Sequence, residues 1–344
     1  TVIEPDQELW LEAESNAGLG MPVGYYALMD SAWRHRHGKS ADEHRDHVAA
    51  LYQRMSETAQ ANEQAWNRNV LEADFIRNAS DKNPMLAFPY TKLHNSSWNV
   101  DQASALIFCS IKKARELGID EKHWIYPACS TESNLMQPVS QRADLSRCYG
   151  AFHAGKRALA LANISIEDVD CFELYSCFPV AVLSFAEELG ILDRLDLTVT
   201  GGMPFAGGPL NNFVLQSTVK MIEVLQQEQK NVGLVSNVSG MNTKQAFSLF
   251  TKTPTAFVME DVTPAVAADS PERELLSDYN GEAVIQAFTV LYNKQGPERA
   301  VIIGENAQQQ RHIAYSQDES VIALALSEDL IGKTALISSG TFSF

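Results

Sequence analysis

Residues 200–212 read TGGMPFAGGPLNN, a stretch with four glycines, two prolines and no charged side chain. Glycine loses more conformational entropy on folding than any other residue, so clustered glycines usually mark unusual backbone angles or the close approach of another group. A tightly packed buried turn would explain the stretch equally well. The local sequence therefore leaves two interpretations open, a ligand-binding loop and a structural turn.

The composition is that of a globular protein. The 344 residues are 45% hydrophobic and 20% charged, and a chain of this length has room for two or three domains. The longest apolar runs, such as 103–109, are too short to cross a bilayer, and no signal-peptide pattern opens the chain. The first residue is Thr1, which suggests a processed or truncated product.

Charge and cysteine content narrow the partners and the compartment. The net charge is −16 and no Lys/Arg block offsets it, which argues against nucleic acid or an anionic membrane surface as a partner. The five cysteines form no C-x-x-C pair and indicate reduced thiols in a cytoplasmic protein. His44 and His47 lie one helical turn apart, but a solvated helix face is favoured over a metal site. We expect no metal ion and no tightly bound cofactor.

The apolar patterns predict helices first, then a layered α/β region, then strands. Ser40 and Glu43 form a capping-box pattern before an apolar stripe at helical spacing. From about residue 88, strands alternate with helices, which is typical of an α/β domain. The predicted helices cover 103–117, 154–162, 179–189 and 210–227, and the predicted strands cover 124–129, 169–175, 232–239 and 255–260. After an aperiodic linker over 263–280, residues 281–344 predict a small all-β domain, similar in shape to an oligonucleotide/oligosaccharide-binding (OB) barrel.

Four segments at the ends of these elements are the candidates for chemistry, since α/β folds place ligands in loops beyond strand ends. They are HNSSWNVD (94–101), ELYSCFP (173–179), TVTGGMPFAGGPLNN (198–212) and GLVSNVSG (233–240). Taken in order, they resemble the thiolase superfamily. The likeness is closest to the type 1 thiolase-like proteins, often named acetyl-CoA acetyltransferases, which carry an extra C-terminal β domain. Asn95, Ser97 and Asp101 match the family's Asn-Ala-Ser-Gly-Ile-Asn-Asp-Gly run.

The resemblance implies a layered α/β/α/β/α thiolase fold, incomplete in its N-terminal part, followed by a small all-β, OB-like domain. It divides the chain into a helical loop domain over 1–87 and the last strand and helix of the N-terminal thiolase domain over 88–119. The C-terminal thiolase domain over 120–262, the linker over 263–280 and the β domain over 281–344 follow. In thiolases the helical loop domain covers the pantetheine arm of coenzyme A.

The catalytic loops depart from the thiolase pattern at three positions. Tyr175 stands where thiolases have a water-holding Asn, Gly208 where they have the His of Gly-His-Pro, and Val238 where they have the Cys of Cys-x-Gly. Carbanion chemistry beside a thioester needs a base and oxyanion donors. We therefore expect no thiolysis or Claisen condensation of acetyl-CoA. The cavity-lining candidates are Tyr175, Cys177, Gly208, Val238 and His94.

The resemblance also implies CoA or an acyl-CoA as ligand, and the candidate binding residues are Ser97, Gly207, Asn211 and Asn212. Asn211 and Asn212 follow the glycine loop at a helix start, where an Asn can cap free N–H groups. The thiolase nucleophile lies upstream of the loop domain, near which this chain begins. We therefore expect either that the upstream half was lost or that another chain supplies it, and we expect a homodimer or an association with such a chain.

Three functions remain open from the sequence. The first is an acyl-CoA-binding thiolase-like protein, altered in catalysis, with an acyltransferase activity on an unknown substrate in lipid metabolism. The second is a non-enzymatic scaffold or subunit that recruits a partner through its β tail. The third is a hydrolase that uses Cys177, although a buried structural thiol is favoured there because no histidine follows at a recognisable offset.

Overall fold

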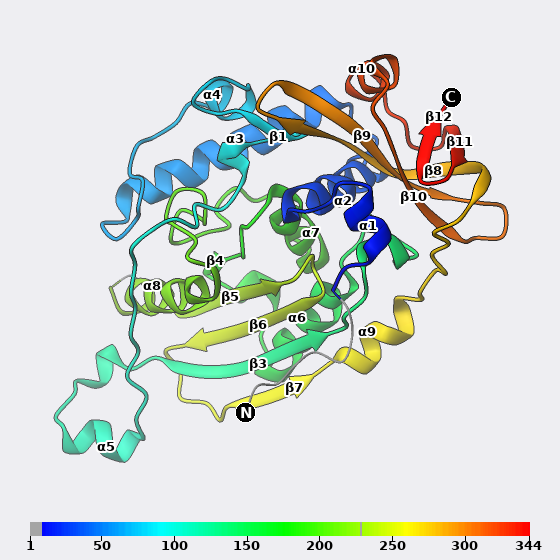
Figure 1. The fold of residues 1–344 in the computed structure, drawn as a ribbon. Helices are drawn as coiled ribbons and strands as arrows, with labels where there is room; N and C mark the ends of the chain where they lie inside the picture. The colour runs from blue at the N-terminus through cyan, green and yellow to red at the C-terminus, as the bar shows by residue number, and fades with distance from the viewer. Residues whose placement is uncertain (1–8, 228) are drawn as a thin grey trace.

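The computed structural model describes residues 9–227 and 229–344, and its first part is helical. Four helices open it: α1 (Glu12–Asn16), α2 (Pro22–Arg36), α3 (Ala41–Ala61) and α4 (Ala73–Arg77). The predicted capping box is confirmed at the start of α3, where the Glu43 N–H donates to Ser40 Oγ at 3.2 Å and the Ser40 N–H donates to Glu43 Oε2 at 2.9 Å. These helices lie along the upper side of the molecule in Figure 1.

A mixed five-stranded sheet forms the centre of the α/β region (Figure 1). Its strands run in the order β4, β5, β6, β3, β7, with β4 parallel to β5, β7 parallel to β3, and β6 antiparallel to both of its neighbours. Their bounds are β3 (Tyr126–Asn134), β4 (Cys171–Glu173), β5 (Val232–Ser239), β6 (Lys244–Thr251) and β7 (Val258–Asp261). The prediction for β5 is confirmed to the residue, whereas β6 was missed.

Helices cover both faces of this sheet. The helix α8 (Phe213–Gln227) packs on one face, where Met221 and Leu225 meet Cys171 of β4. On the other face lie α6 (Tyr149–Ala162) and α7 (Pro179–Leu189), and α7 also contacts α2. Neighbouring strand residues point to opposite faces, so Phe172 belongs to the main core while Cys171 lies under α8.

The C-terminal residues close into a small barrel. Its strands are β8 (Asn280–Asn293), β9 (Gly296–Glu305), β10 (Arg311–Ser316), β11 (Thr334–Ser338) and β12 (Thr341–Ser343). They pair as β8–β9–β10–β12–β11, and β11 pairs back to β8, which leaves the ring without a free edge. The predicted C-terminal β-rich domain is confirmed, whereas its likeness to an OB barrel stays a prediction.

The barrel shares the hydrophobic core of the α/β region. In the run RAVIIG, Ile302 points into the barrel whereas Val301 and Ile303 pack in the main core. Both faces of β9 are therefore buried, which explains why its apolar residues run on without alternation. A second link is the short strand β1 (Met85–Ala87), which pairs with β8 and with β2 (Tyr90–Thr91).

The structure corrects several predicted elements. The expected helix over 103–117 is wrong in extent, because only α5 (Ile111–Glu116) is helical and residues 101–110 carry no regular structure. Short helices gain most of their stability from packing an apolar face, and here Ile107 is 91% and Phe108 71% exposed. The expected last strand of an N-terminal domain over 88–119 is replaced by β2, which joins the barrel sheet.

Two helices were also missed. The helix α9 (Thr263–Asp269) occupies the expected linker, and α10 (Glu319–Ser327) lies within the expected all-β tail, between β10 and β11. Short 3₁₀ turns occupy Lys92–His94, Glu121–His123, Val139–Gln141, Ile166–Asp168 and Leu210–Asn212. The domain divisions themselves stay a prediction.

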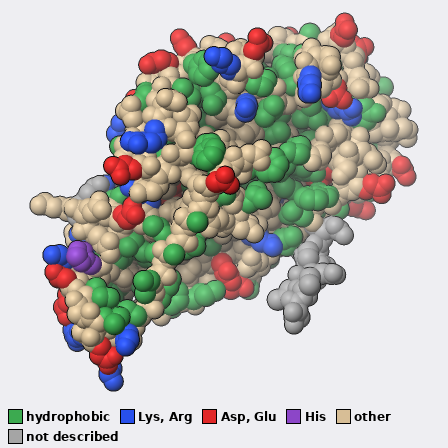
Figure 2. Space-filling view, turned by 60° about the vertical axis from the view of Figure 1, so that its left-hand side comes forward, with side chains coloured by type: hydrophobic (Ala, Val, Ile, Leu, Met, Phe, Trp, Pro, Cys, Tyr) green, Lys and Arg blue, Asp and Glu red, His purple; other side chains and the backbone are tan. Residues whose placement is uncertain are grey.

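The surface carries a projecting arm and mixed charge. The arm holds α5 and stands out from the sheet at the lower left of Figure 1. On the face shown in Figure 2, Lys and Arg side chains lie scattered among Asp and Glu. Within residues 9–227 and 229–344, no helix has the length and apolarity to span a bilayer.

Candidate functional site

The loops singled out from the sequence meet at one end of the five-stranded sheet. The Gly208 N–H donates to Ser97 O at 2.8 Å, and the Ser97 N–H donates to Met203 O at 3.1 Å. The Met203 N–H donates to Ser176 Oγ at 2.9 Å, which ties the glycine loop to the loop after β4. Three of the four segments are therefore held together by short hydrogen bonds.

Two glycines show why residues with larger side chains would not fit in this loop. Gly201 has φ +101°, and a Cβ there would lie 2.4 Å from Ala59 Cβ. Gly207 has φ +100°, and a Cβ there would lie 2.3 Å from Gln102 Oε1. Other side chains rarely adopt such angles. The glycines therefore let this loop pack closely against α3 and against the segment around Gln102.

A buried carboxylate anchors the start of the same loop. Glu173, the last residue of β4, accepts hydrogen bonds from the Val199 and Thr200 N–H groups at 2.8 and 2.9 Å and from the hydroxyls of Thr198 and Thr200. Burial raises the pKa of Glu173 to about 7, although these hydrogen bonds act in the opposite direction. Glu173 lies in the segment 173–179, but its sequence context does not reveal this buried role.

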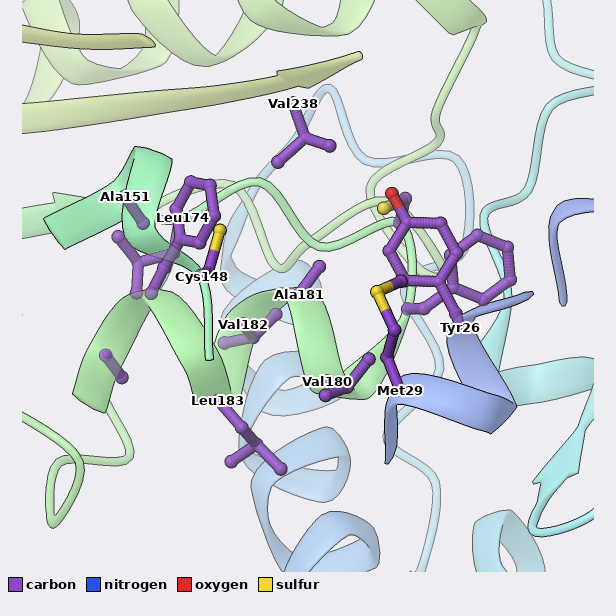
Figure 3. Packing of buried hydrophobic residues seen from close by; sticks show 14 of the residues in the cluster. Tyr26, Met29, Cys148, Ala151, Leu174, Val180, Ala181, Val182, Leu183 and Val238 are labelled. Carbon is purple, nitrogen blue, oxygen red and sulfur yellow. The ribbon is translucent and has the colours of Figure 1, made fainter. Parts of the chain in front are cut away.

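Tyr26 of α2 fills the space where the loops converge. Its hydroxyl donates to Gly240 O at 2.9 Å, and its ring stacks on Phe178 with the ring centroids 4.2 Å apart. Figure 3 shows Tyr26 and Met29 reaching from α2 toward Val238 and the start of α7. The expected reaction centre is therefore packed with apolar and aromatic side chains.

Three of the predicted cavity residues border this packed centre. Val238 is 4% and Cys177 8% exposed. Burial raises the pKa of the Cys177 thiol to about 12, so the thiol is not an ionised nucleophile at neutral pH. The Tyr175 ring meets Phe213 edge-on at 5.6 Å and is directed toward α8. None of the three supplies a group that exchanges protons near neutral pH.

His94 is buried and neutral. Its Nδ1 accepts from the Thr91 N–H at 3.0 Å, while its Nε2 has no partner among the described residues. Burial lowers the pKa of His94 to about 3. The Tyr52 hydroxyl donates to His94 O at 3.3 Å, so this histidine is held in the core. Because His94 is not protonated at neutral pH, it cannot serve as a general acid there.

A cavity of about 70 Å³ lies beside Gly207, between the glycine loop, the 102–104 segment and α8. Three of its lining side chains have a buried polar atom without a partner among the described residues: Gln102 Oε1, Ser104 Oγ and Gln216 Oε1. The Gln102 amide is held in one orientation, because its Nε2 donates to Ala206 O at 2.7 Å and to Gln64 O at 3.1 Å. Its oxygen is therefore free to accept from a ligand.

The neighbourhood of this cavity also carries exposed indoles. The backbone N–H of Trp66 donates to Ala206 O at 3.0 Å. Trp98 directly follows Ser97, whose backbone bonds to the glycine loop. Their side chains are 52% and 57% exposed. Purine rings stack readily on such surfaces.

Of the four predicted binding residues, Gly207 lines the cavity and Ser97 contacts the loop through its backbone. Asn211 is exposed, and Asn212 keeps an unpartnered buried Nδ2. Neither asparagine side chain makes a capping hydrogen bond to α8 in the described part of the chain. Both lie in the 3₁₀ turn before the helix, a geometry that the residue pattern does not reveal.

The two histidines of α3 belong to no cluster of metal-ligating side chains among the described residues. His44 is buried, and its Nε2 lies 2.9 Å from both oxygens of Asp30, which also accepts from the Tyr90 hydroxyl at 2.7 Å. The interpretation of His44 as part of a solvated face is therefore wrong, because this face packs against α2. No cluster of metal-ligating side chains occurs over residues 9–227 and 229–344.

Comparison with known families identifies the class. Residues 131–197 match the model for the thiolase C-terminal domain-like family. Residues 261–340 match the model for the additional C-terminal domain of thiolase-like protein type 1. The resemblance to the thiolase superfamily predicted from the sequence is confirmed: the chain has a mixed α/β thiolase-like fold with the C-terminal β-rich domain of the type 1 proteins.

Individual relatives agree with this assignment. The 3-ketoacyl-CoA thiolase of Marinomonas sp. (strain MWYL1) is 30% identical over 41% of this chain and 34% of its own length. The acetyl-CoA acetyltransferase of Methanocaldococcus jannaschii is 28% identical over 49% of this chain and 41% of its own. The chain thus spans about a third of the length of the first of these relatives.

One solved structure matches a larger share of this chain than these two relatives do. The crystal structure of a monomeric SCP2-thiolase-like protein type 1 from Mycobacterium smegmatis superposes with a TM-score of 0.86 at 26% identity. The match covers 98% of this chain and 76% of that one.

Proposed function

We propose that this chain binds CoA or an acyl-CoA and does not perform thiolase chemistry with the usual groups. The observation that carries the proposal is the cavity beside Gly207, with unpartnered acceptors from Gln102, Ser104 and Gln216. The pantetheine arm of CoA carries amide N–H groups that match such acceptors. Unpaired buried acceptors cost free energy until a donor reaches them.

Calorimetric titration with CoA and acetyl-CoA tests the binding. Gln102→Ala removes one acceptor and should weaken affinity about fivefold to tenfold, as expected for one hydrogen bond. Gln295→Ala, in the exposed β8–β9 turn, is the matched control and should bind like the wild type. Absence of detectable binding by the wild-type chain would overturn the proposal.

The catalytic part of the proposal is tested by following acetoacetyl-CoA consumption with CoA. We expect no turnover at thiolase rates, because the base and one oxyanion donor are missing and each such donor is typically worth about 10²–10³ in rate. Gly208→His should not rescue activity, since a Cβ at that position would lie 2.9 Å from Met203 Cβ, which cannot move away without the backbone. Wild-type turnover at ordinary thiolase rates would show that the loops have been matched wrongly.

The scaffold function is the second candidate, and the packed centre around Tyr26 favours it. In that case the C-terminal barrel recruits a partner, which would co-purify in stoichiometric amount while CoA fails to bind. We also propose a cytoplasmic location, supported by a sequence whose cysteines form no C-x-x-C pair. A homodimer or an association with a chain that carries an N-terminal thiolase half stays a proposal, and light scattering of the purified chain tests the dimer.

A further inference from the structure

A second, separate cavity of about 30 Å³ lies between the β5–β6 turn and the first turn of α6. Its lining includes Arg142, Cys148, Gly150, Asn242 and Gln245. Arg142 also contacts the turn that follows Val238, because its Nη2 donates to Met241 O. The cavity therefore lies directly behind the loop that in thiolases carries the acid/base cysteine.

Arg142 is a buried cation without a carboxylate partner. It is 8% exposed, and in the described part of the chain its side-chain nitrogens contact backbone carbonyls and a thioether, not a carboxylate. Its Nε and Nη2 donate to Gln137 O, whereas its Nη1 lies 3.2 Å from the thioether of Met29. A thioether is a weak acceptor, so an oxygen of an incoming ligand would be a stronger partner for Nη1 than Met29 is. Burial lowers the pKa of Arg142, as expected for a charge that lacks compensation.

The acids nearby are engaged elsewhere. Glu14 accepts from the Ser140 N–H and hydroxyl at 2.9 and 2.7 Å, and Glu188 forms a two-pronged pair with Arg147. Asp144 lines the cavity but accepts from the Ser146 N–H and hydroxyl. None of these carboxylates forms an ion pair with Arg142 in the described part of the chain, and Arg147 adds a second cation to the lining of the cavity that Asp144 also borders.

Asn242 provides the second observation that points to a ligand. It is 9% exposed, and its Oδ1 is buried without a partner in the described part of the chain. Its backbone has φ 53°, which holds the side chain at the turn. The amide can rotate to present either Oδ1 or Nδ2, since neither atom is fixed by a neighbour. The 14-residue helix α6 adds the positive end of its dipole, because Gly150 of its first turn lines the same cavity.

We propose that this cavity binds a carboxylate group through Arg142 and Asn242. The cavity of about 30 Å³ suits one such group, and charge-assisted hydrogen bonds between a guanidinium and a carboxylate are roughly twice as strong as neutral ones. The carboxylate belongs either to the far end of a dicarboxylic acyl chain carried on CoA or to a free small carboxylic acid. The first source rests on the proposed function, and the second does not.

Two measurements distinguish the sources. For the acyl-borne group, glutaryl-CoA is compared with valeryl-CoA, which has the same chain length and a methyl end. We expect glutaryl-CoA to bind about tenfold or more tightly, from one charge-assisted hydrogen bond. For the free acid, thermal unfolding is followed in sodium acetate against sodium chloride at equal ionic strength, where specific binding raises the midpoint.

Arg142→Gln is the direct variant, but it removes four contacts and risks misfolding. Asn242→Asp avoids this, because it keeps Arg142 and places a carboxylate beside it. Its unliganded form should unfold at a higher temperature than the wild type, and its preference for glutaryl-CoA and its response to acetate should disappear. Asn293→Asp, at the exposed end of β8, adds the same charge elsewhere and should behave like the wild type.

The outcomes separate the two proposals. If valeryl-CoA binds as tightly as glutaryl-CoA and acetate has no effect, the cavity holds water only and the carboxylate site is overturned while CoA binding stands. If neither thioester binds, CoA binding is overturned, and the acetate measurement alone decides the carboxylate site. Retention of either response in Asn242→Asp also contradicts the proposed site.

Discussion

At the scale of single residues, Gly207 has a backbone angle that favours glycine and closely packed neighbours, and it lies at the rim of the larger of the two cavities. Gly207→Ala combines φ +100° with a clash against Gln102 Oε1. We expect a loss of about 1–3 kcal/mol in unfolding free energy and weaker CoA binding, because Gln102 must move. Urea unfolding and calorimetry measure the two effects.

Gly190→Ala is the control for this substitution. Gly190 has φ +79°, yet no atom lies within 4 Å of an added Cβ. This variant should show the cost of the left-handed backbone alone and should bind CoA like the wild type. Equal binding by both variants would contradict a role of the Gly207–Gln102 contact.

Glu173 should make stability depend on pH. Its pKa is raised from the ordinary value of 4.5 to about 7, so between these pH values the folded chain binds more protons than the unfolded chain. The stabilisation is complete below about pH 4.5 and is lost as pH rises through 7, by on the order of 3 kcal/mol. Glu173→Gln should remove this part of the pH dependence in urea unfolding. An unchanged slope in the variant would rule out Glu173 as its source.

Some of the site could be predicted from the sequence, and the rest could not, for a physical reason. Gly208 and Val238 stand out because they replace groups whose chemistry is specific. Tyr26 could not be found in this way, since it meets Gly240 across 214 residues of chain and looks like an ordinary residue of an apolar helix. Arg142 likewise becomes notable only once its burial and its lack of a carboxylate partner among the described residues are known.

At the scale of elements, prediction succeeded where local signals and tertiary packing agree. The helix α7 was predicted to the residue, because Pro179 starts it and Gly190 ends it with φ 79°. The helix predicted over 103–117 failed because its apolar face has no neighbour to pack against in the described residues. The helix α10 was missed because its apolar run also suits a buried strand.

The arm should be the first element cut by a protease. Its Lys112, Lys113 and Arg115 side chains are 87%, 56% and 65% exposed. Residues 101–110 hold the arm without regular structure, so opening there costs little free energy. Limited trypsin digestion followed by mass spectrometry should give two fragments, with the cut between them within residues 112–115. First cleavage within the barrel or α3 would contradict this.

At the scale of the whole molecule, the barrel and the α/β region should unfold together. Ala287, Val301, Ile303 and Ile313 of the barrel belong to the main core, and the Phe288 N–H donates to Ser31 Oγ of α2 at 3.0 Å. Full burial of Val301, Ile303 and Ile313 is worth about 1.5–3 kcal/mol each, and their sum approaches the stability of a typical domain. Calorimetry should therefore show one transition.

Deletion of residues 280–344 provides the complementary measurement. The shortened chain would expose this apolar surface and leave β1 without its partner β8. We expect loss of the cooperative transition and of near-ultraviolet circular dichroism. Two well-separated transitions in the full chain, or a stable shortened chain, would show that the barrel is an independent unit.

The tryptophans beside the Gly207 cavity should make ligand binding detectable by fluorescence. Trp66 and Trp98 are half exposed near the cavity, whereas Trp33 is fully buried against α7, where its indole N–H donates to Glu187 at 2.8 Å. Filling of the cavity by CoA should shift the emission of the two exposed indoles to shorter wavelength and protect them from iodide quenching. The Trp33 emission should stay constant and serve as an internal standard. A Trp66→Phe, Trp98→Phe double variant should lose the response, and if it does not, the fluorescence signal arises away from the cavity.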